Sequence, residues 1–423
     1  MCEPTTSLLL LFILCKSLSF GEIQANDYKC VSKLNFTDVD VVIYIGCRIP
    51  SHGPPELKDL IEDLNDIHSI YPQFDDTLNV YTPRYTPQRV RRVIFAPTRG
   101  ISDTIDGTLD VYDSATKAAT LAYLGAFKSS ESVLVVIGSD VANSQAPWRA
   151  KNMIELNIAL GSLYPLYQPK NRTKKYEQFA IFNASREVMK FSEAVENGRR
   201  IARHITSEQG VVWSYANLLQ LLQSTFQDNV IHLNISDFWR ANSSTGPSLE
   251  GKIFHMKYRP VDAKSAVVLI TSCSIRRGIA TIAGFFETIR WLQPKATEFQ
   301  AVIGCFEGNL DPLSDLHGNS LNEVFGIQMP NGNADVYVIG AEKGVLERRN
   351  SYYYGQQLDY EFGPLMDDNR VANFIKQSIR KKAAKNIFFL EKDGEGDSAS
   401  PLYSTPIAGL VNRYLLKQFK QWQ

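Results

Sequence analysis

The chain has 423 residues, of which 44% are hydrophobic and 21% are charged, a balance typical of a globular protein long enough to bury two cores. Its 45 basic residues equal its 45 acidic residues. Composition therefore gives no indication of a nucleic acid or an anionic membrane as partner, because both favour an excess of positive charge.

The N-terminus differs from the rest of the chain in hydropathy. Leu8–Cys15 is an unbroken apolar run, and the small residues Ser19 and Gly21 follow it. A run this short cannot cross a bilayer, which needs ~20 apolar residues, but it suits a secretory signal. The sequence predicts a signal peptide over residues 1–21, with a buried N-terminal strand as the alternative. No later segment is apolar enough for a membrane anchor, so we expect a secreted, extracellular protein.

The first half of the chain alternates between strand and helix patterns. Continuous apolar runs predict buried strands, and apolar residues at helical spacing predict helices between them. The strands are expected at 39–47, 91–98, 132–139 and 177–184, and the helices at 110–127 and 150–167. This alternation predicts an α/β domain over residues 22–184 with a parallel or mixed sheet.

A long helix is predicted over residues 185–206, where it would link the two halves. Ser185 is a suitable N-cap because its hydroxyl can accept a hydrogen bond from a backbone N–H of the first turn. Glu187 places a negative charge near the positive end of the helix dipole.

The second half alternates again and predicts a second α/β domain over residues 207–423. Strands are expected at 251–260, 265–272, 298–307, 334–341 and 386–391, with a helix at 278–293. The apolar residues of this helix share one face, and Pro294 follows its end. They are Ile279, Ile282, Ala283, Phe286 and Ile289.

Five N-x-Ser/Thr sequons agree with a secretory route. One such tripeptide is common by chance, but five beside a signal sequence indicate glycosylation at some of them. The sequons are at Asn35, Asn171, Asn183, Asn234 and Asn242.

Removal of the signal would leave four cysteines, Cys30, Cys47, Cys273 and Cys305. An oxidising compartment permits two disulfides among them. Of the three connectivities, we favour pairing within each half, Cys30–Cys47 and Cys273–Cys305. Buried thiols are the alternative.

The usual signatures of catalysis and metal binding are absent from the sequence. It contains no G-x-S-x-G, H-E-x-x-H, P-loop, G-x-G-x-x-G or C-x-x-C. The acidic stretch EKDGEGDSAS starts like a calcium loop, but Ser404 stands where a bidentate carboxylate is needed. The Asp311, Asp315 and His317 group lies between Pro and Gly residues, which favours a surface loop.

Three segments resemble the M17 (leucyl) aminopeptidase family. They are PWRAKNMIELNIALGSLYPLYQPK, AVENGRRIARHI and GIATIAGFFETIRWLQPK, and the order of elements is similar to that family over residues 35–350. The resemblance implies an N-terminal macro-like α/β domain, a linking helix and a C-terminal M17-type α/β/α domain with a mixed sheet. It also implies a hexamer built from trimers.

In that family, two metal ions activate water for attack on the first peptide bond, and three motifs supply their carboxylates. The first, a glycine-rich strand end, is missing here because strand 265–272 runs directly into Cys273. The second is K-x-D-M, and alignment on Gly278 puts Ile275 at its Asp. Arg276 and Arg277 follow, and they would repel a cation.

The third motif, N-T-D-A-E-G-R, aligns with VYVIGAEKGVLERR. Lys343 then stands at the Asp, Val345 at the Glu and Glu347 at the Arg, with Glu342 adjacent. A site without these carboxylates cannot offset the desolvation of two divalent ions.

The sequence thus predicts a secreted, glycosylated, catalytically inactive M17 homologue with no cofactor and a binding or structural role. Its expected partners are a peptide or protein ligand and further copies of itself. Two alternatives stay open. One is an active leucyl-type aminopeptidase holding zinc or manganese with non-standard ligands. The other is a shared α/β architecture with an unrelated function.

Overall fold

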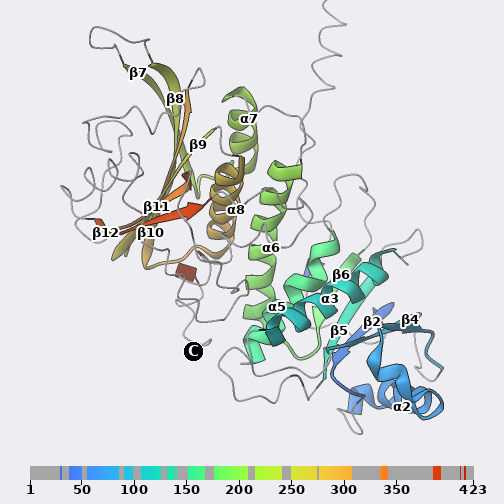
Figure 1. The fold of residues 1–423 in the computed structure, drawn as a ribbon. Coiled ribbons are helices and arrows are strands. Elements are labelled where there is room, and N and C mark those ends of the chain that lie inside the picture. The colour runs from blue at the N-terminus through green and yellow to red at the C-terminus, as the bar shows by residue number, and fades with distance from the viewer. Residues whose placement is uncertain are drawn as a thin grey trace, which may run out of the picture.

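A computed structural model describes residues 29–30, 38–49, 55–84, 90–98, 106–124, 131–138, 141, 151–166, 176–207, 215–240, 249–273, 276–306, 334–341, 384–391, 410 and 414–415. Two six-stranded sheets lie at opposite ends of one long helix (Figure 1). Both sheets are mixed, so the predicted two-part α/β fold is confirmed. The predicted signal peptide lies outside the described residues.

The N-terminal sheet has the strand order β1-β6-β5-β2-β4-β3. All neighbouring strands are parallel except the β3–β4 pair. The strands are β1 (Lys29–Cys30), β2 (Val41–Gly46), β3 (Asn79–Tyr81), β4 (Arg92–Pro97), β5 (Glu131–Ile137) and β6 (Tyr176–Ile181). Continuous apolar runs suit β2, β4 and β5 because helices cover both faces of a parallel sheet.

Two separate apolar clusters form on the two faces of this sheet. Val42 and Tyr44 pack with α2 (Lys58–Ile70), which follows η2 (Pro55–Leu57) and precedes η3 (Pro72–Asp76). Val41 and Ile43 point to the other face, because successive side chains of a strand alternate. That face is covered by α3 (Asp106–Leu124) and α5 (Lys151–Leu163), which continues into η5 (Tyr164–Leu166).

The C-terminal sheet has the strand order β12-β11-β9-β10-β8-β7. The four strands from β12 to β10 are parallel, and β8 and β7 are antiparallel to their neighbours. The strands are β7 (His232–Arg240), β8 (Leu249–Tyr258), β9 (Ser265–Ser272), β10 (Thr297–Phe306), β11 (Ala334–Ala341) and β12 (Ala384–Glu391). One face packs on α6 (Arg186–Ser207), α7 (Tyr215–Thr225) and α8 (Arg276–Leu292).

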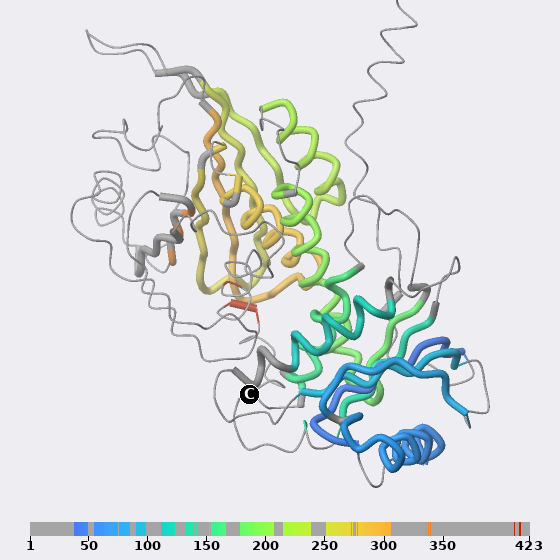
Figure 2. Tube along the Cα trace, turned by 45° about the vertical axis from the view of Figure 1, so that its right-hand side comes forward, coloured from blue at the N-terminus to red at the C-terminus, as the bar shows by residue number. Residues whose placement is uncertain are grey.

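The long helix α6 begins as predicted. Ser185 Oγ accepts a hydrogen bond from the Val188 N–H at 3.2 Å, which satisfies one donor of the first turn. The predicted apolar face of α8 is also confirmed, since Ile279, Ile282, Ala283, Phe286 and Ile289 are all buried. In Figure 2, α6 runs from the helices of the N-terminal sheet to α8 and the C-terminal sheet. Within the described ranges, none of the helices has the length and hydropathy needed to span a membrane.

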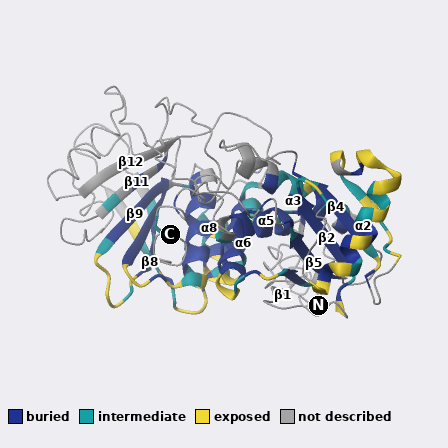
Figure 3. Cartoon of the chain, turned by 90° about the horizontal axis from the view of Figure 1, so that it is seen from below, coloured by how far each residue is buried: buried dark blue, intermediate teal, exposed yellow. Residues whose placement is uncertain are grey.

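Helices α6 and α8 approach each other so closely that only glycine fits at their contact. A Cβ atom on Gly198 would lie 2.2 Å from the Gly284 carbonyl oxygen and 2.3 Å from Thr288 Oγ1. Both distances are far below van der Waals contact. Residues that flank the contact on both helices are buried, among them Val195, Ile201, Ala283 and Phe285, and most of this helix pair is dark blue in Figure 3.

On its other side, α6 is tied to the N-terminal helices by a buried charged network. Arg199 is 1% exposed and forms an ion pair with Glu196 at 3.1 Å. Its Nη2 donates to Tyr112 Oη at 2.5 Å, and its Nη1 donates to the Leu160 carbonyl at 3.3 Å. Arg203 also pairs with Glu196 and stacks on the Tyr164 ring. A charge buried this deeply requires such partners, and they fix the position of α6 on α3 and α5.

Three described residues of the C-terminal segment, Leu410, Tyr414 and Leu415, pack into the C-terminal core. Leu410 and Leu415 are buried there with the side chains of α8 and β10. Tyr414 Oη donates to Asp335 Oδ2 at 2.7 Å and lies 2.5 Å from Tyr337 Oη. Burial raises the pKa of Tyr414, so its hydroxyl remains protonated and available as a donor.

The glycine contact predicts that Gly198→Ala destabilises the protein by about 1–3 kcal/mol, because the new methyl group must push α8 away. In an unpacked helix the same change would stabilise by about 1 kcal/mol. Urea unfolding would measure the difference, with Lys190→Ala on the exposed side of α6 as the control. A stabilised Gly198→Ala variant would contradict the close contact.

The packing of the chain end predicts that Leu415→Ala lowers the free energy of unfolding by about 2–5 kcal/mol. Ile70→Ala is the matched control, because Ile70 is 75% exposed and its loss should change stability by less than about 0.5 kcal/mol. Thermal and urea unfolding of both variants would test this. If Leu415→Ala changed the free energy of unfolding no more than Ile70→Ala does, residue 415 would contribute no buried contact.

Candidate functional site

The topology of the C-terminal sheet marks one place where a ligand can bind. From β9 the chain passes through α8 to β10 on one side, whereas β11 lies on the other side of β9. Ligands of open α/β sheets bind at such a switch point, outside the carboxyl ends of the parallel strands. The candidate site is therefore the edge where β9 and β11 end, near Cys273 and Ala341.

Three cross-links hold this edge together. Thr271 Oγ1 is buried and donates to the Ile339 carbonyl at 3.0 Å, which joins β9 to β11. The Cys273 N–H donates to the Gly304 carbonyl at 2.9 Å, which extends the ladder between β9 and β10. Cys273 and Cys305 form a disulfide with their Cα atoms 4.9 Å apart. The predicted pairing within the second half is thus the one observed.

The other predicted disulfide is wrong. Cys47 is a reduced thiol, and its Sγ lies 3.0 Å from Thr98 Oγ1. Cys30 ends β1, and β6 and β5 stand between β1 and β2. Strand spacing puts the two cysteines at least about 14 Å apart, whereas the Cα atoms of a disulfide lie within ~7 Å of each other. Proximity in sequence suggested this pair, and the strand order separates it.

The N-terminus of α8 brings positive charge to the candidate site. Arg276 is the first residue of the helix and is half-buried. Arg277 is the second, and its side chain lies outside the described residues, as does Ile275. The helix dipole adds partial positive charge at the same point. The described part of this end of α8 therefore carries positive charge.

The described residues of this edge do not match the ligands of a two-metal site. Among the residues that the structure describes, no three His, Cys, Asp or Glu side chains come together to hold a metal ion. The sulfurs of Cys273 and Cys305 are bonded to each other, so neither is a thiolate ligand. The remaining predicted positions, Lys343, Val345 and Glu347, lie outside the described residues, as do Asp311, Asp315, His317 and Glu342.

Two of the five sequons are described, and both asparagines are exposed. Asn183 lies in the turn between β6 and α6 with φ 58°, and Asn234 lies on β7. The other three, Asn35, Asn171 and Asn242, lie outside the described residues.

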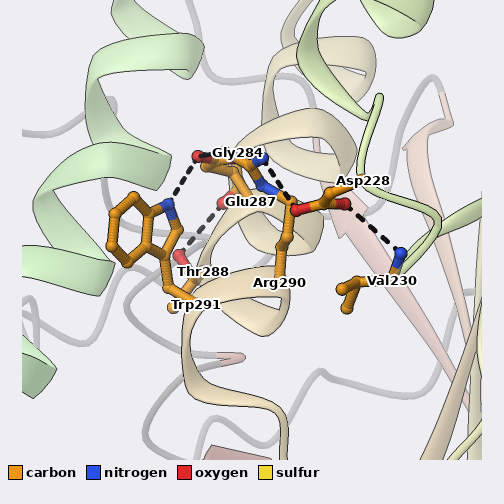
Figure 4. Close-up of polar contacts among 7 residues, drawn as sticks. All are labelled: Asp228, Val230, Gly284, Glu287, Thr288, Arg290 and Trp291. Atoms are coloured by element: carbon orange, nitrogen blue, oxygen red, sulfur yellow. Dashed lines mark hydrogen bonds and ion pairs between the residues drawn. The ribbon is translucent and has the colours of Figure 1, made fainter. Parts of the chain in front are cut away.

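A polar cluster at the opposite end of α8 was not predicted from the sequence. Arg290 donates to both oxygens of Glu287, at 2.8 and 2.6 Å, and to Asp228 Oδ2 at 3.0 Å (Figure 4). Trp291 Nε1 donates to Glu287 Oε1 at 2.8 Å, and the Val230 N–H donates to Asp228 Oδ1 at 3.3 Å. These contacts fasten the segment before β7 to α8. Because they lie at the far end of the helix from the candidate site, the cluster has a structural role.

Known proteins with the same fold are leucyl aminopeptidases. An M17 aminopeptidase from Trypanosoma brucei superposes with a TM-score of 0.59 and 11% identity, over 96% of this chain and 100% of that one. The T. brucei leucyl aminopeptidase in complex with bestatin gives 0.57 and 11%, over 97% and 100%. A mutant tomato leucine aminopeptidase gives 0.49 and 14%, and there the match covers 70% of this chain and 66% of that one.

The comparisons by sequence found no relatives. No protein-family profile matches the chain, and no curated protein matches it. The class that the structure defines is therefore a fold, that of the M17 leucyl aminopeptidases. Sequence identities near 11% show that the fold is shared, but they do not show that the activity is shared.

The disulfide predicts that a Cys273→Ser/Cys305→Ser variant loses about 3–4 kcal/mol of stability, since the bond closes a loop with a sequence separation of 32. Urea unfolding with and without reductant would measure this loss. Cys47→Ser is the control, because this thiol contacts Thr98 Oγ1 and closes no disulfide loop. If reductant lowered the free energy of unfolding of the double variant as much as that of the wild type, the stabilising disulfide would not be Cys273–Cys305.

Proposed function

We propose that the chain is a secreted, glycosylated M17 aminopeptidase homologue that lacks peptidase activity and has a binding or structural role. Its ligand would be a peptide or protein, bound at the carboxyl edge of the C-terminal sheet, and copies of the chain would associate. The whole-length likeness to M17 structures supports the homology. The apolar N-terminal run and the five sequons support the secretory route.

The observation that carries the proposal is the Cys273–Cys305 disulfide at the ends of β9 and β10. The resemblance places the first metal-binding motif of the family at the end of β9. Here that strand ends instead in a covalent cross-link that joins it to its neighbour. A disulfide contributes rigidity but no anionic ligand, so it preserves the shape of the edge without its metal chemistry.

Charge at the start of α8 supports the same conclusion. Arg276 and the helix N-terminus repel a divalent cation, whereas they attract a carboxylate. The resemblance places an aspartate ligand next to this position, at Ile275. A peptide with an acidic group near its contact point is therefore the ligand that this end of the site favours.

The second candidate function is that of an active metal-dependent leucyl-type aminopeptidase with non-standard ligands. One observation favours it. The segments that follow β10 and β11 leave the sheet at the candidate edge, after Phe306 and Ala341, and both carry acidic residues. Asp311, Asp315, His317, Glu342 and Glu347 would then be the source of ligands for zinc or manganese.

Metal stoichiometry separates the two functions. The purified secreted protein would be incubated with zinc and manganese, desalted and measured by elemental mass spectrometry, beside the T. brucei enzyme as a positive control. The proposal predicts less than about 0.1 metal per chain, because a site without its carboxylates cannot offset ion desolvation. One or two retained ions per chain would contradict it.

Activity provides the second readout. We expect no hydrolysis of a leucyl substrate by this chain and no heat of binding with bestatin, the compound seen in a T. brucei complex. If hydrolysis is detected, Asp315→Ala and Glu342→Ala would test the alternative ligands. Turnover abolished by both changes would establish the enzyme and overturn the proposal.

A further inference from the structure

Within the part of the chain that the structure describes, one edge of the C-terminal sheet is open along a long strand. Strand β7 has nine residues, and among the described residues it pairs only with β8. Its ladder with β8 runs from His232 to Arg240 with no bulge. Unpaired N–H and C=O groups on such an edge invite a strand of another chain, which leads to non-native association.

The usual protein devices that protect an edge are missing from the middle of β7. Natural edges are interrupted by bulges, proline or charged side chains, often lysine. The stretch Leu233–Ser236 contains none of these. The first charged residue after this stretch is Asp237. Its carboxylate forms an ion pair with Lys252 of the neighbouring strand β8.

The sequon at Asn234 occupies this unprotected stretch. Leu233 and Ile235 pack against the core, so Asn234 points to the opposite face of the sheet, in register with His255. Asn234 is exposed, as a glycosylated asparagine must be. Asn234, Ile235 and Ser236 complete the tripeptide.

We propose that Asn234 carries an N-linked glycan and that this glycan shields the open edge of β7 from pairing with another chain. A new strand would have to approach within about 4.8 Å of β7 along its length. A large hydrated glycan rooted at the centre of the uncharged stretch obstructs that approach. The proposal rests on the secretory route of the proposed function.

The second described sequon differs in a way that makes it a control. Asn183 lies in a turn, where φ is 58°, and no strand edge is open there. A glycan on Asn183 would add mass and solubility but would cover no backbone ladder. Loss of the Asn183 glycan should therefore leave the association state unchanged.

The test uses the full chain secreted from cultured animal cells. Wild type, Asn234→Gln, Ser236→Ala, Ser236→Thr and Asn183→Gln would be compared by glycopeptide mapping and by light scattering across a concentration series. We expect Asn234→Gln and Ser236→Ala to lose one glycan and to form larger, concentration-dependent species. Ser236→Thr, which keeps the sequon, should behave as wild type.

Two further measurements separate edge protection from a role of the glycan in folding. Endoglycosidase treatment of the folded wild-type protein should produce the same association as Asn234→Gln. Asn234→Lys removes the glycan but restores a charged edge, so it should keep the wild-type association state. Association of Asn234→Lys equal to that of Asn234→Gln would overturn the shielding role.

The outcomes also distinguish this inference from the proposed function. A chain that is secreted and glycosylated elsewhere, but not at Asn234, overturns the inference alone. An occupied Asn234 whose removal leaves association unchanged does the same. A chain that remains inside the cell without glycans overturns the secretory route and the inference together, whereas the metal measurement tests the inactive site independently.

Discussion

The contact between α6 and α8 at Gly198 is the constraint on which the rest of the molecule depends. Because Gly198 has no side chain, the backbone of α6 lies against the Gly284 carbonyl and the Thr288 hydroxyl of α8. Helix α6 is bound to the N-terminal helices α3 and α5 through Arg199 and its buried partners. Helix α8 packs on the C-terminal sheet. One pair of helices therefore connects the two sheets, and separation of the pair would expose the core shared by α6, α8 and the C-terminal sheet.

The same arrangement positions the candidate site. The buried face of α8 locks the helix on the sheet, so its first residue, Arg276, is held beside the carboxyl ends of β9 and β11. The Cys273–Cys305 bond and the Thr271 hydrogen bond tie those strand ends to their neighbours. The described part of the edge is thus cross-linked at its strand ends and carries the positive charge of Arg276. The fold is that of the leucyl aminopeptidases, and a fold by itself does not determine function.

Burial explains which elements were predictable from the sequence. Strands β2 and β9 are continuous apolar runs because both of their faces are covered, and such runs are visible without any knowledge of neighbours. Helix α8 is similarly clear, since its apolar residues recur at helical spacing. Helix α2 and strand β7 were not predicted because each buries only one face. Polar residues on the other face interrupt the apolar runs by which the remaining elements were recognised.

The sequence by itself determined the strands with continuous apolar runs, the helices α6 and α8, and the N-cap at Ser185. These features depend on residues that are near in sequence, so no distant neighbour is needed to recognise them. Only the tertiary structure decided the strand order, which separates Cys30 from Cys47, creates the switch point beside β9 and leaves β7 at an edge. Strand order is set by which apolar faces cover each other across long stretches of chain, and that choice has no signature in any single segment.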